Sequence, residues 1–195
     1  MPQNRPELSH EEKAADIRHA AGRLFLDKGY GATTIAQVAR DAGVASNVVH
    51  WYFGTKDQLF VAVLEDLQDS RLQDLEGRFR RVSEGDELNA FISYLTRQAT
   101  ARQDHFGLIA TVHERSHVSE DIATFHQAAH ARYETSLRTV LARWRIPEDE
   151  LQLVTETLVA ALESLVMHRA SRQSCRHMMT FLAEKLVAPF PLNPT

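Results

Sequence analysis

Residues 33–60 read TTIAQVARDAGVASNVVHWYFGTKDQLF, and this stretch decides the expected fold. Thr34 followed by Gln37 is a capping box, in which each side chain bonds a backbone N–H that a helix start leaves unpaired. Gly43 stands where a left-handed residue closes a short helix, and Gly54 breaks the chain after the next one. The stretch therefore predicts two short helices joined by a tight glycine turn.

The same signals flank this stretch. Ser9 with Glu12 forms a capping box that opens an earlier helix, and Gly29 ends it. Thr55 with Gln58 forms another box, after which a long helix begins. Helices separated by glycine turns at this spacing predict a compact helical module at the start of the chain.

The second short helix, over about 45–52, carries apolar residues on one side and polar and aromatic residues on the other. Such a helix fits the major groove of DNA, about 12 Å wide, where amides and hydroxyls read bases and ring N–H groups donate to phosphates. Lys56 adds positive charge at the next helix start, where exposed N–H groups attract phosphate. The predicted DNA-binding residues are Thr33, Thr34, Gln37, Ala45, Ser46, Asn47, His50, Trp51, Tyr52 and Lys56.

This stretch resembles the DNA-binding signature of the TetR family of transcriptional regulators. The resemblance covers residues 11–60 in order and spacing. It is carried by Gly29-Tyr30, Ala32-Thr33-Thr34, Val38-Ala39, Ala42-Gly43-Val44, Tyr52-Phe53 and Lys56-Asp57-Gln58-Leu59-Phe60.

Three residues depart from the family pattern. Ala45 replaces the usual serine cap, with Ser46 as the neighbouring candidate for it, and Val48 replaces a small polar residue. His50 stands where a phosphate-binding tyrosine is usual. These departures bear on the preferred DNA sequence and not on the fold.

The remainder of the chain also reads as helical. No proline occurs from Glu7 to Ile146, and strand-like alternation is scarce. We therefore expect an all-α fold, with an N-terminal helix-turn-helix three-helix DNA-binding domain followed by a helical ligand-binding and dimerisation domain. The expected bounds are 1–54 for the first domain, 55–187 for the second and 188–195 for a C-terminal tail.

The resemblance implies that the second domain binds a small-molecule effector. Aromatic and polar side chains of the central helices are candidates to line its cavity, although side chains of this kind are more often core residues than ligand contacts. The predicted ligand-binding residues are Phe91, Tyr94, Phe106, Ile109, His113, Phe125, Tyr133 and Met167.

The resemblance also implies a homodimer, whose interface is a four-helix arrangement of the last two helices. The apolar stripes of 147–170 and 174–187 need a partner surface, and an intramolecular core is the alternative. A two-fold dimer would hold two recognition helices about 34–36 Å apart, one turn of DNA. The predicted interface residues are Leu151, Val154, Leu158, Leu162, Leu165, Met178 and Leu182.

The histidines allow a different interpretation. Residues 113–117 read HERSH, which fits the H-E-x-x-H motif of zinc proteases, with Glu134 or His130 as a third ligand. His126 and His130 repeat the same spacing, so a metal effector also stays open. Solvated or partly buried histidines are the simpler alternative, and we predict no metal, no catalytic residue and no cofactor.

Composition narrows the class of protein. The 195 residues are 44% hydrophobic and 25% charged, as in a globular protein. The net charge of -4 does not by itself indicate that the protein binds nucleic acid. No run of about eighteen apolar residues occurs, so we expect no membrane span and a cytoplasmic protein. A single cysteine, Cys175, excludes an internal disulfide.

Together these features predict a DNA-binding transcriptional regulator and not an enzyme. The expected form is a ligand-responsive repressor that binds double-stranded, palindromic operator DNA as a homodimer and is released by a small-molecule effector. Two alternatives remain. The protein could bind DNA constitutively, without any ligand, or it could be a helical scaffold whose N-terminal helices do not bind DNA.

Overall fold

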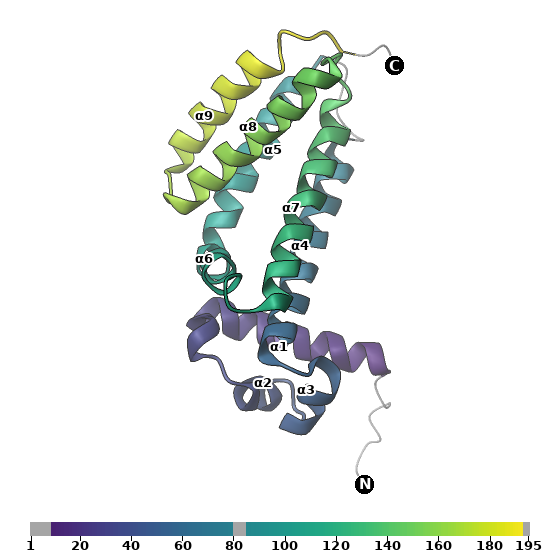
Figure 1. Cartoon of the computed structure of the whole chain (residues 1–195), viewed down its shortest axis with the longest axis vertical. Helices are drawn as coiled ribbons and strands as arrows, with labels where there is room; N and C mark the ends of the chain where they lie inside the picture. The colour runs from purple at the N-terminus through teal and green to yellow at the C-terminus, as the bar shows by residue number, and fades with distance from the viewer. Residues whose placement is uncertain (1–8, 80–84, 193–195) are drawn as a thin grey trace. The chain divides into compact units, whose positions relative to one another are not determined.

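The computed structural model describes residues 9–79 and 85–192 (Figure 1). The helices of this part are α1 (His10–Ala32), α2 (Ile35–Asp41), α3 (Ser46–Phe53), α4 (Lys56–Phe79), α5 (Glu87–Asp104), α6 (Phe106–Arg115), α7 (Glu120–Leu141), α8 (Glu148–Met167) and α9 (Arg172–Leu186). No strand occurs among the described residues, where an isolated β-bridge joins Trp144 and Leu192. The expectation of an all-α fold is confirmed.

The three capping boxes form as the sequence predicts, and they set where α1, α2 and α4 begin. In the box of α1, Glu12 N donates to Ser9 Oγ (3.2 Å) and Ser9 N to Glu12 Oε2 (2.7 Å). In the box of α2, Gln37 N donates to Thr34 Oγ1 (3.2 Å) and Thr34 N to Gln37 Oε1 (2.9 Å). In the box of α4, Gln58 N donates to Thr55 Oγ1 (3.1 Å) and Thr55 N to Gln58 Oε1 (3.2 Å). Each box satisfies N–H groups that a helix start leaves unpaired.

Glycines with positive φ redirect the chain between these helices. Gly29 has φ 80°, so the regular part of α1 ends there although the helical assignment continues to Ala32. Gly54 has φ 65°, and a Cβ atom there would lie 2.4 Å from Gln58 Oε1, inside the capping box of α4. Only glycine fits that turn without strain and without displacing the cap.

The described residues group into two compact units, which we call the head unit and the regulatory unit. The head unit contains described residues up to 67 together with 111–125, and the regulatory unit contains 68–110 together with 126–192. The expected boundary after residue 54 does not follow this grouping, because the first turns of α4 pack with α1. The division into functional domains stays a prediction.

An aromatic cluster forms the centre of the head unit. Phe25 and Phe60 are 1% and 0% exposed, and their rings meet edge to face with centroids 5.1 Å apart. Tyr30 packs on both, at 5.8 Å from Phe25 and 5.0 Å from Phe60. Because Phe60 belongs to α4 and Phe25 to α1, this cluster fixes those two helices to each other.

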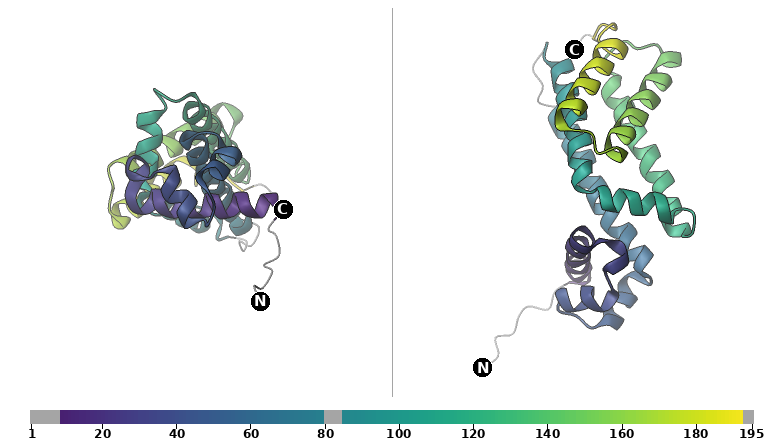
Figure 2. Two further views of the ribbon diagram at one scale, coloured as in Figure 1. Left: turned by 90° about the horizontal axis from the view of Figure 1, so that it is seen from below. Right: turned by 90° about the vertical axis from the view of Figure 1, so that its left-hand side faces the viewer.

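In the regulatory unit, α5 lies against α8 and α9, as Figures 1 and 2 both show. Its core includes Phe91 of α5, Leu158 of α8 and Met179 of α9, each fully buried. Phe190 and Leu192 pack against this core. The described part of the expected C-terminal tail is therefore part of the regulatory unit. No described helix is long and apolar enough to cross a membrane.

Phe25→Ala should lower the free energy of unfolding by about 3–5 kcal/mol, because it leaves a cavity in the aromatic cluster. Urea unfolding followed by circular dichroism measures the change. Leu26→Ala is the matched control, since Leu26 is 46% exposed on the same helix. A Phe25→Ala protein as stable as the Leu26→Ala protein would contradict this description of the core.

Candidate nucleic-acid interface

Helix α3 exposes the face that the sequence predicts. Val49 is fully buried, whereas Ser46, Asn47 and His50 are exposed. Trp51 is 70% exposed, a large apolar surface for one side chain. The predicted outward orientation of these residues is confirmed, and their contact with DNA stays a prediction.

The start of α3 lacks a side-chain cap. Ala45 is the N-cap residue and its side chain makes no capping bond, while Ser46 is the first helical residue. Ser46 therefore does not replace the missing cap. Its hydroxyl is exposed at the start of the helix, where it is free to approach a base or a phosphate.

Thr33 is not placed to contact DNA. It is 1% exposed, and its hydroxyl donates to the carbonyl oxygens of Gly29 (2.8 Å) and Leu24 (3.1 Å). The physical reason is the turn at Gly29, which leaves carbonyls of α1 without helical partners. The side chains of Thr34 and Gln37 bond to backbone N–H groups in the capping box of α2, and Thr34 is exposed to solvent.

Three rings from α1 and α3 gather beside the exposed face. The His10 ring lies 5.1 Å from Trp51 and 4.5 Å from Tyr52, and the Trp51 and Tyr52 rings meet edge to face at 4.8 Å. Tyr52 is half-buried in this arrangement. The start of α1 therefore supports the orientation of Trp51.

Lys56 lies over an aromatic ring. Its Nζ is 4.1 Å from the centre of the Tyr30 ring, and the Arg115 guanidinium carbon is 4.7 Å from the same centre. Partial burial and then the Arg115 charge lower the pKa of the Lys56 ammonium group. The cation at the start of α4 is held in place by Tyr30.

Asp57 connects three segments of the head unit. Its carboxylate accepts a short hydrogen bond from the Tyr30 hydroxyl and another from Arg115 Nη2 at 3.0 Å. The Ser119 hydroxyl also donates to it. The start of α4 is thus bonded to the end of α1 and to the turn between α6 and α7.

These contacts change the acidities of both partners. Partial burial opposes the ionisation of Asp57, but the hydrogen bonds from Arg115, Tyr30 and Ser119 outweigh it and lower the pKa of the carboxyl. Burial, followed by the hydrogen bond to Asp57, raises the pKa of Tyr30 to about 12. Asp57 is therefore ionised and Tyr30 protonated at neutral pH.

The sequence does not single out this network. Tyr30 and Asp57 both belong to the quoted motif, but Arg115 is separated from Asp57 by 58 residues and Ser119 by still more. No short-range pattern links them. Tyr30 next to the helix-breaking Gly29 is the one local signal of a positioned ring.

Comparisons with known proteins agree with this geometry. Residues 17–63 match the family described as bacterial regulatory proteins, tetR family. The HTH-type transcriptional regulator AcrR of Shigella flexneri is 26% identical over 150 residues, which cover 71% of this chain and 69% of that protein. The chain belongs to the TetR family. Members of this family are transcriptional regulators and not enzymes.

One further sequence relative and one solved structure match this TetR-family chain over different lengths. The regulator HbdR of Aromatoleum sp. (strain CIB) is 38% identical over 65 residues, and this match spans 33% of the chain and 28% of HbdR. A solved transcriptional regulator of Saccharomonospora viridis, in complex with choline, superposes with a TM-score of 0.73 at 16% identity, covering 90% of this chain and 97% of that one. The structural likeness supports the fold.

The predicted ligand-binding residues of this TetR protein do not gather in one unit. Phe91 and Tyr94 are buried in the core of the regulatory unit, and Tyr133 packs half-buried against it. Phe106 and Ile109 are half-buried in the same unit, and Met167 is 40% exposed. His113 and Phe125 belong to the head unit.

Gln98 of α5 is not among the residues predicted from the sequence. Gln98 is 4% exposed, and its Oε1 accepts no hydrogen bond from any described residue. A buried amide oxygen without a donor is costly, which makes Gln98 a candidate to receive a ligand donor. Its position in an apolar helix face is the signal that sequence reasoning overlooked.

The predicted interface stripe of α8 lies inside the chain. Leu151, Val154, Leu158, Leu162 and Leu165 are each at most 8% exposed. They face α5 and α9 of the same chain, which leaves little of their surface to a partner. The exposed apolar side chains are Leu153 (66%) of α8 and Met178 (45%) and Phe181 (57%) of α9, with Leu182 half-buried.

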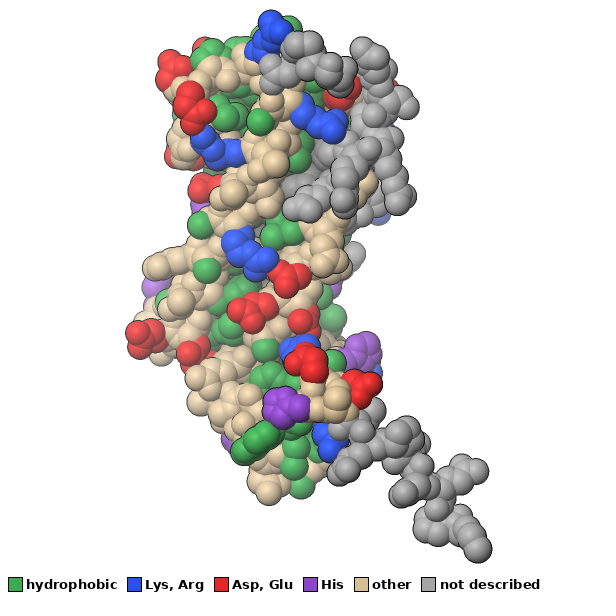
Figure 3. All heavy atoms as spheres, turned by 90° about the vertical axis from the view of Figure 1, so that its right-hand side faces the viewer, with side chains coloured by type: hydrophobic (Ala, Val, Ile, Leu, Met, Phe, Trp, Pro, Cys, Tyr) green, Lys and Arg blue, Asp and Glu red, His purple; other side chains and the backbone are tan. Residues whose placement is uncertain are grey.

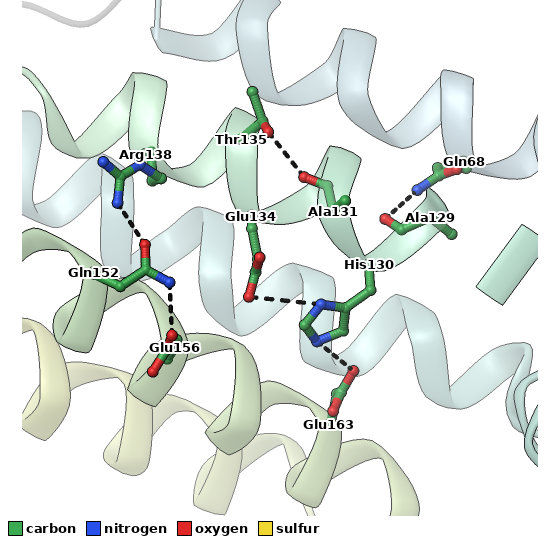
Figure 4. Close-up of polar contacts among 10 residues, drawn as sticks. All are labelled: Gln68, Ala129, His130, Ala131, Glu134, Thr135, Arg138, Gln152, Glu156 and Glu163. Atoms are coloured by element: carbon green, nitrogen blue, oxygen red, sulfur yellow. Dashed lines mark hydrogen bonds and ion pairs between the residues drawn. The ribbon is translucent and has the colours of Figure 1, made fainter. Parts of the chain in front are cut away.

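The histidine motifs do not form a metal site among the described residues. Helix α6 ends at Arg115, so His117 lies in the turn beyond it and not one helical turn above His113. Nowhere in the described ranges do three or more His, Cys, Asp or Glu side chains group as metal ligands. His130 instead lies between Glu134 (3.6 Å) and Glu163 (3.8 Å), bridging α7 and α8 (Figure 4).

On the face drawn in Figure 3, charge alone does not mark a DNA-binding area. In the view of Figure 3, Lys and Arg side chains are scattered among Asp and Glu and form no continuous basic area. This agrees with the net charge of -4. Affinity for a polyanion must therefore come from the local geometry of α3 and the start of α4.

Asp57→Asn should remove part of the acid dependence of stability. Because the folded pKa of Asp57 lies below its ordinary value of 3.8, its ionised form stabilises the fold above that value, and this stabilisation is lost as the pH falls through the folded pKa. Urea midpoints from about pH 3 to about pH 7 measure the effect. Asp27→Asn, at an exposed site on α1, is the control. Equal pH profiles for wild type and Asp57→Asn would exclude the network as a source of stability.

Proposed function

We propose that this TetR-family chain is a ligand-responsive repressor that binds a palindromic operator as a homodimer and releases it when a small molecule binds. The observation that carries the proposal is the exposed face of α3, whose opposite side is buried. Val49 is fully buried where α3 packs on α2, and Ser46, Asn47 and Trp51 lie on its exposed side. Such a face has the size and the groups to enter a major groove.

Each exposed residue has a distinct part in this proposal. Asn47 presents an amide that pairs with both N6 and N7 of adenine. Ser46 and the Trp51 ring N–H donate to phosphate oxygens and set the register. Lys56, positioned on the Tyr30 ring, supplies the cation at the start of α4.

The regulatory unit is the proposed site of the effector. Gln98 offers a buried acceptor with no described donor, on a helix where Leu95 and Ala99 beside it are also buried. The Saccharomonospora viridis regulator, with the same fold, was solved with choline. This precedent supports small-molecule binding by the fold and leaves the effector of this chain open.

The Asp57 network is the proposed link between effector and DNA. Helices α4, α6 and α7 each contribute residues to both units. An effector that favours a different position of α6 would act on Arg115, and through it on Asp57 at the start of α4. Only a difference in effector affinity between the two arrangements is required.

The proposed dimer uses the exposed apolar side chains of α8 and α9. Leu153, Met178 and Phe181 are large apolar groups left on the surface, together with the half-buried Leu182. A two-fold axis through this surface would bury them against their own copies. Two heads related by that axis match an inverted repeat in DNA.

Binding to a duplex from upstream of the protein's own gene tests the regulator assignment. Asn47→Ala should reduce discrimination between the operator and a scrambled duplex by about 1–3 kcal/mol. Lys56→Ala should weaken binding to both duplexes and lower the salt slope by about one. Fluorescence anisotropy at several salt concentrations measures both effects.

Lys28→Ala, which removes an exposed cation from α1, is the matched control for Lys56→Ala. If both Asn47→Ala and Lys56→Ala bind as the wild type does, α3 is not the reading element. Absence of binding by the wild type in dilute salt would favour a helical scaffold with an inactive head.

The double substitution Leu153→Glu and Phe181→Glu should convert the dimer to a monomer, because it places carboxylates in the proposed apolar contact. Light scattering after size exclusion should report a change from twice the mass of the chain to its single mass. Leu26→Glu changes an equally large exposed side chain on α1 and should leave the dimer intact. A dimer that survives the double substitution would place the interface elsewhere.

A further inference from the structure

His50 makes a contact that limits how it meets DNA. Its Nδ1 lies 2.8 Å from the carbonyl oxygen of Gly54, one turn further along at the end of α3. A carbonyl oxygen only accepts hydrogen bonds, so Nδ1 must carry the hydrogen. The backbone at Gly54 therefore selects the tautomer of the ring.

This tautomer leaves Nε2 with a lone pair when the ring is neutral. A phosphate oxygen is also an acceptor, so neutral His50 has no hydrogen to give it through Nε2. Protonation adds that hydrogen and a positive charge while the bond to Gly54 persists. An Nε2–H that can donate to a phosphate is thus present only in the imidazolium form.

We infer that His50 binds a DNA phosphate only as the imidazolium, so that operator binding by α3 takes up protons. The inference rests on the proposed DNA-binding function. His50 is exposed on the same face of α3 as Asn47, three residues away. The bound phosphate stabilises the charged ring, and the affinity for DNA consequently falls as the pH rises.

Neighbouring elements carry other charged groups that must be distinguished from His50. They are His10 on α1, Arg40 and Asp41 on α2, and Lys56 and Asp57 on α4. Asp41 is paired with Arg23 at 2.6 Å, and Asp57 with Arg115 at 3.0 Å. His10, packed on Trp51 and Tyr52, is the competing imidazole. A second histidine close to α3 makes a matched variant necessary.

Histidine side chains ordinarily change charge between about pH 5 and pH 8. Each His50 that contacts a phosphate as the imidazolium should reduce the affinity by up to about tenfold per unit rise in pH. The experiment uses the full-length protein and a labelled duplex from upstream of its own gene, from about pH 6 to about pH 8.5 at constant ionic strength. Anisotropy gives the affinity.

Two substitutions at His50 separate charge from shape. His50→Gln cannot be protonated and should bind with nearly the same affinity across this range, close to the wild-type affinity at its alkaline end. His50→Tyr supplies a hydroxyl donor that does not titrate near neutrality, so its affinity should also be flat in pH. His19→Gln, at an exposed histidine of α1, should keep the wild-type pH dependence.

Calorimetry of the same binding reaction in buffers of different ionisation enthalpy counts the protons directly. Uptake by wild type that disappears in His50→Gln supports the inference. Equal affinity of the wild type at all pH values, or an unchanged pH slope in His50→Gln, overturns it. A slope lost in His10→Gln instead assigns the proton to His10 and also overturns it. No binding at any pH rejects the regulator function itself.

Discussion

The carboxylate of Asp57 is the point on which the head unit depends. It accepts hydrogen bonds from Tyr30 after the break in α1, from Arg115 at the end of α6 and from Ser119 before α7. The Tyr30 ring in turn packs on Phe25 and Phe60 and carries Lys56 on its face. One charged group thus joins the start of α4 to the end of α1 and to the segment from Arg115 to Ser119.

Local chemistry explains why so much of the head could be predicted from the sequence. Capping boxes at Ser9, Thr34 and Thr55 act within four residues, and glycines such as Gly29 and Gly54 act through their own backbone. Signals of this kind are visible in the chain itself. The amphipathic pattern then determines which side of α3 is buried, as Val49 and Trp51 illustrate.

Long-range contacts explain what the sequence did not reveal. The apolar stripe of α8 predicts a dimer interface and leaves a core as the alternative, and only the packing of α5 and α9 shows that Leu158 and Leu162 are internal. Thr33 lies in a motif of predicted DNA-binding residues, yet its hydroxyl donates to the Gly29 carbonyl oxygen, which the turn leaves without a helical partner. Arg115 meets Asp57 only because the chain returns to α4.

Hydroxyl-radical footprinting of the purified protein on the DNA upstream of its own gene tests the central claim most directly. Two recognition helices on one two-fold dimer should protect two backbone segments about one helical turn apart, on one face of the duplex. Trp51→Ala should weaken both protections together. An unprotected duplex in dilute salt would contradict the account, because α3 would then present its exposed face to something other than DNA.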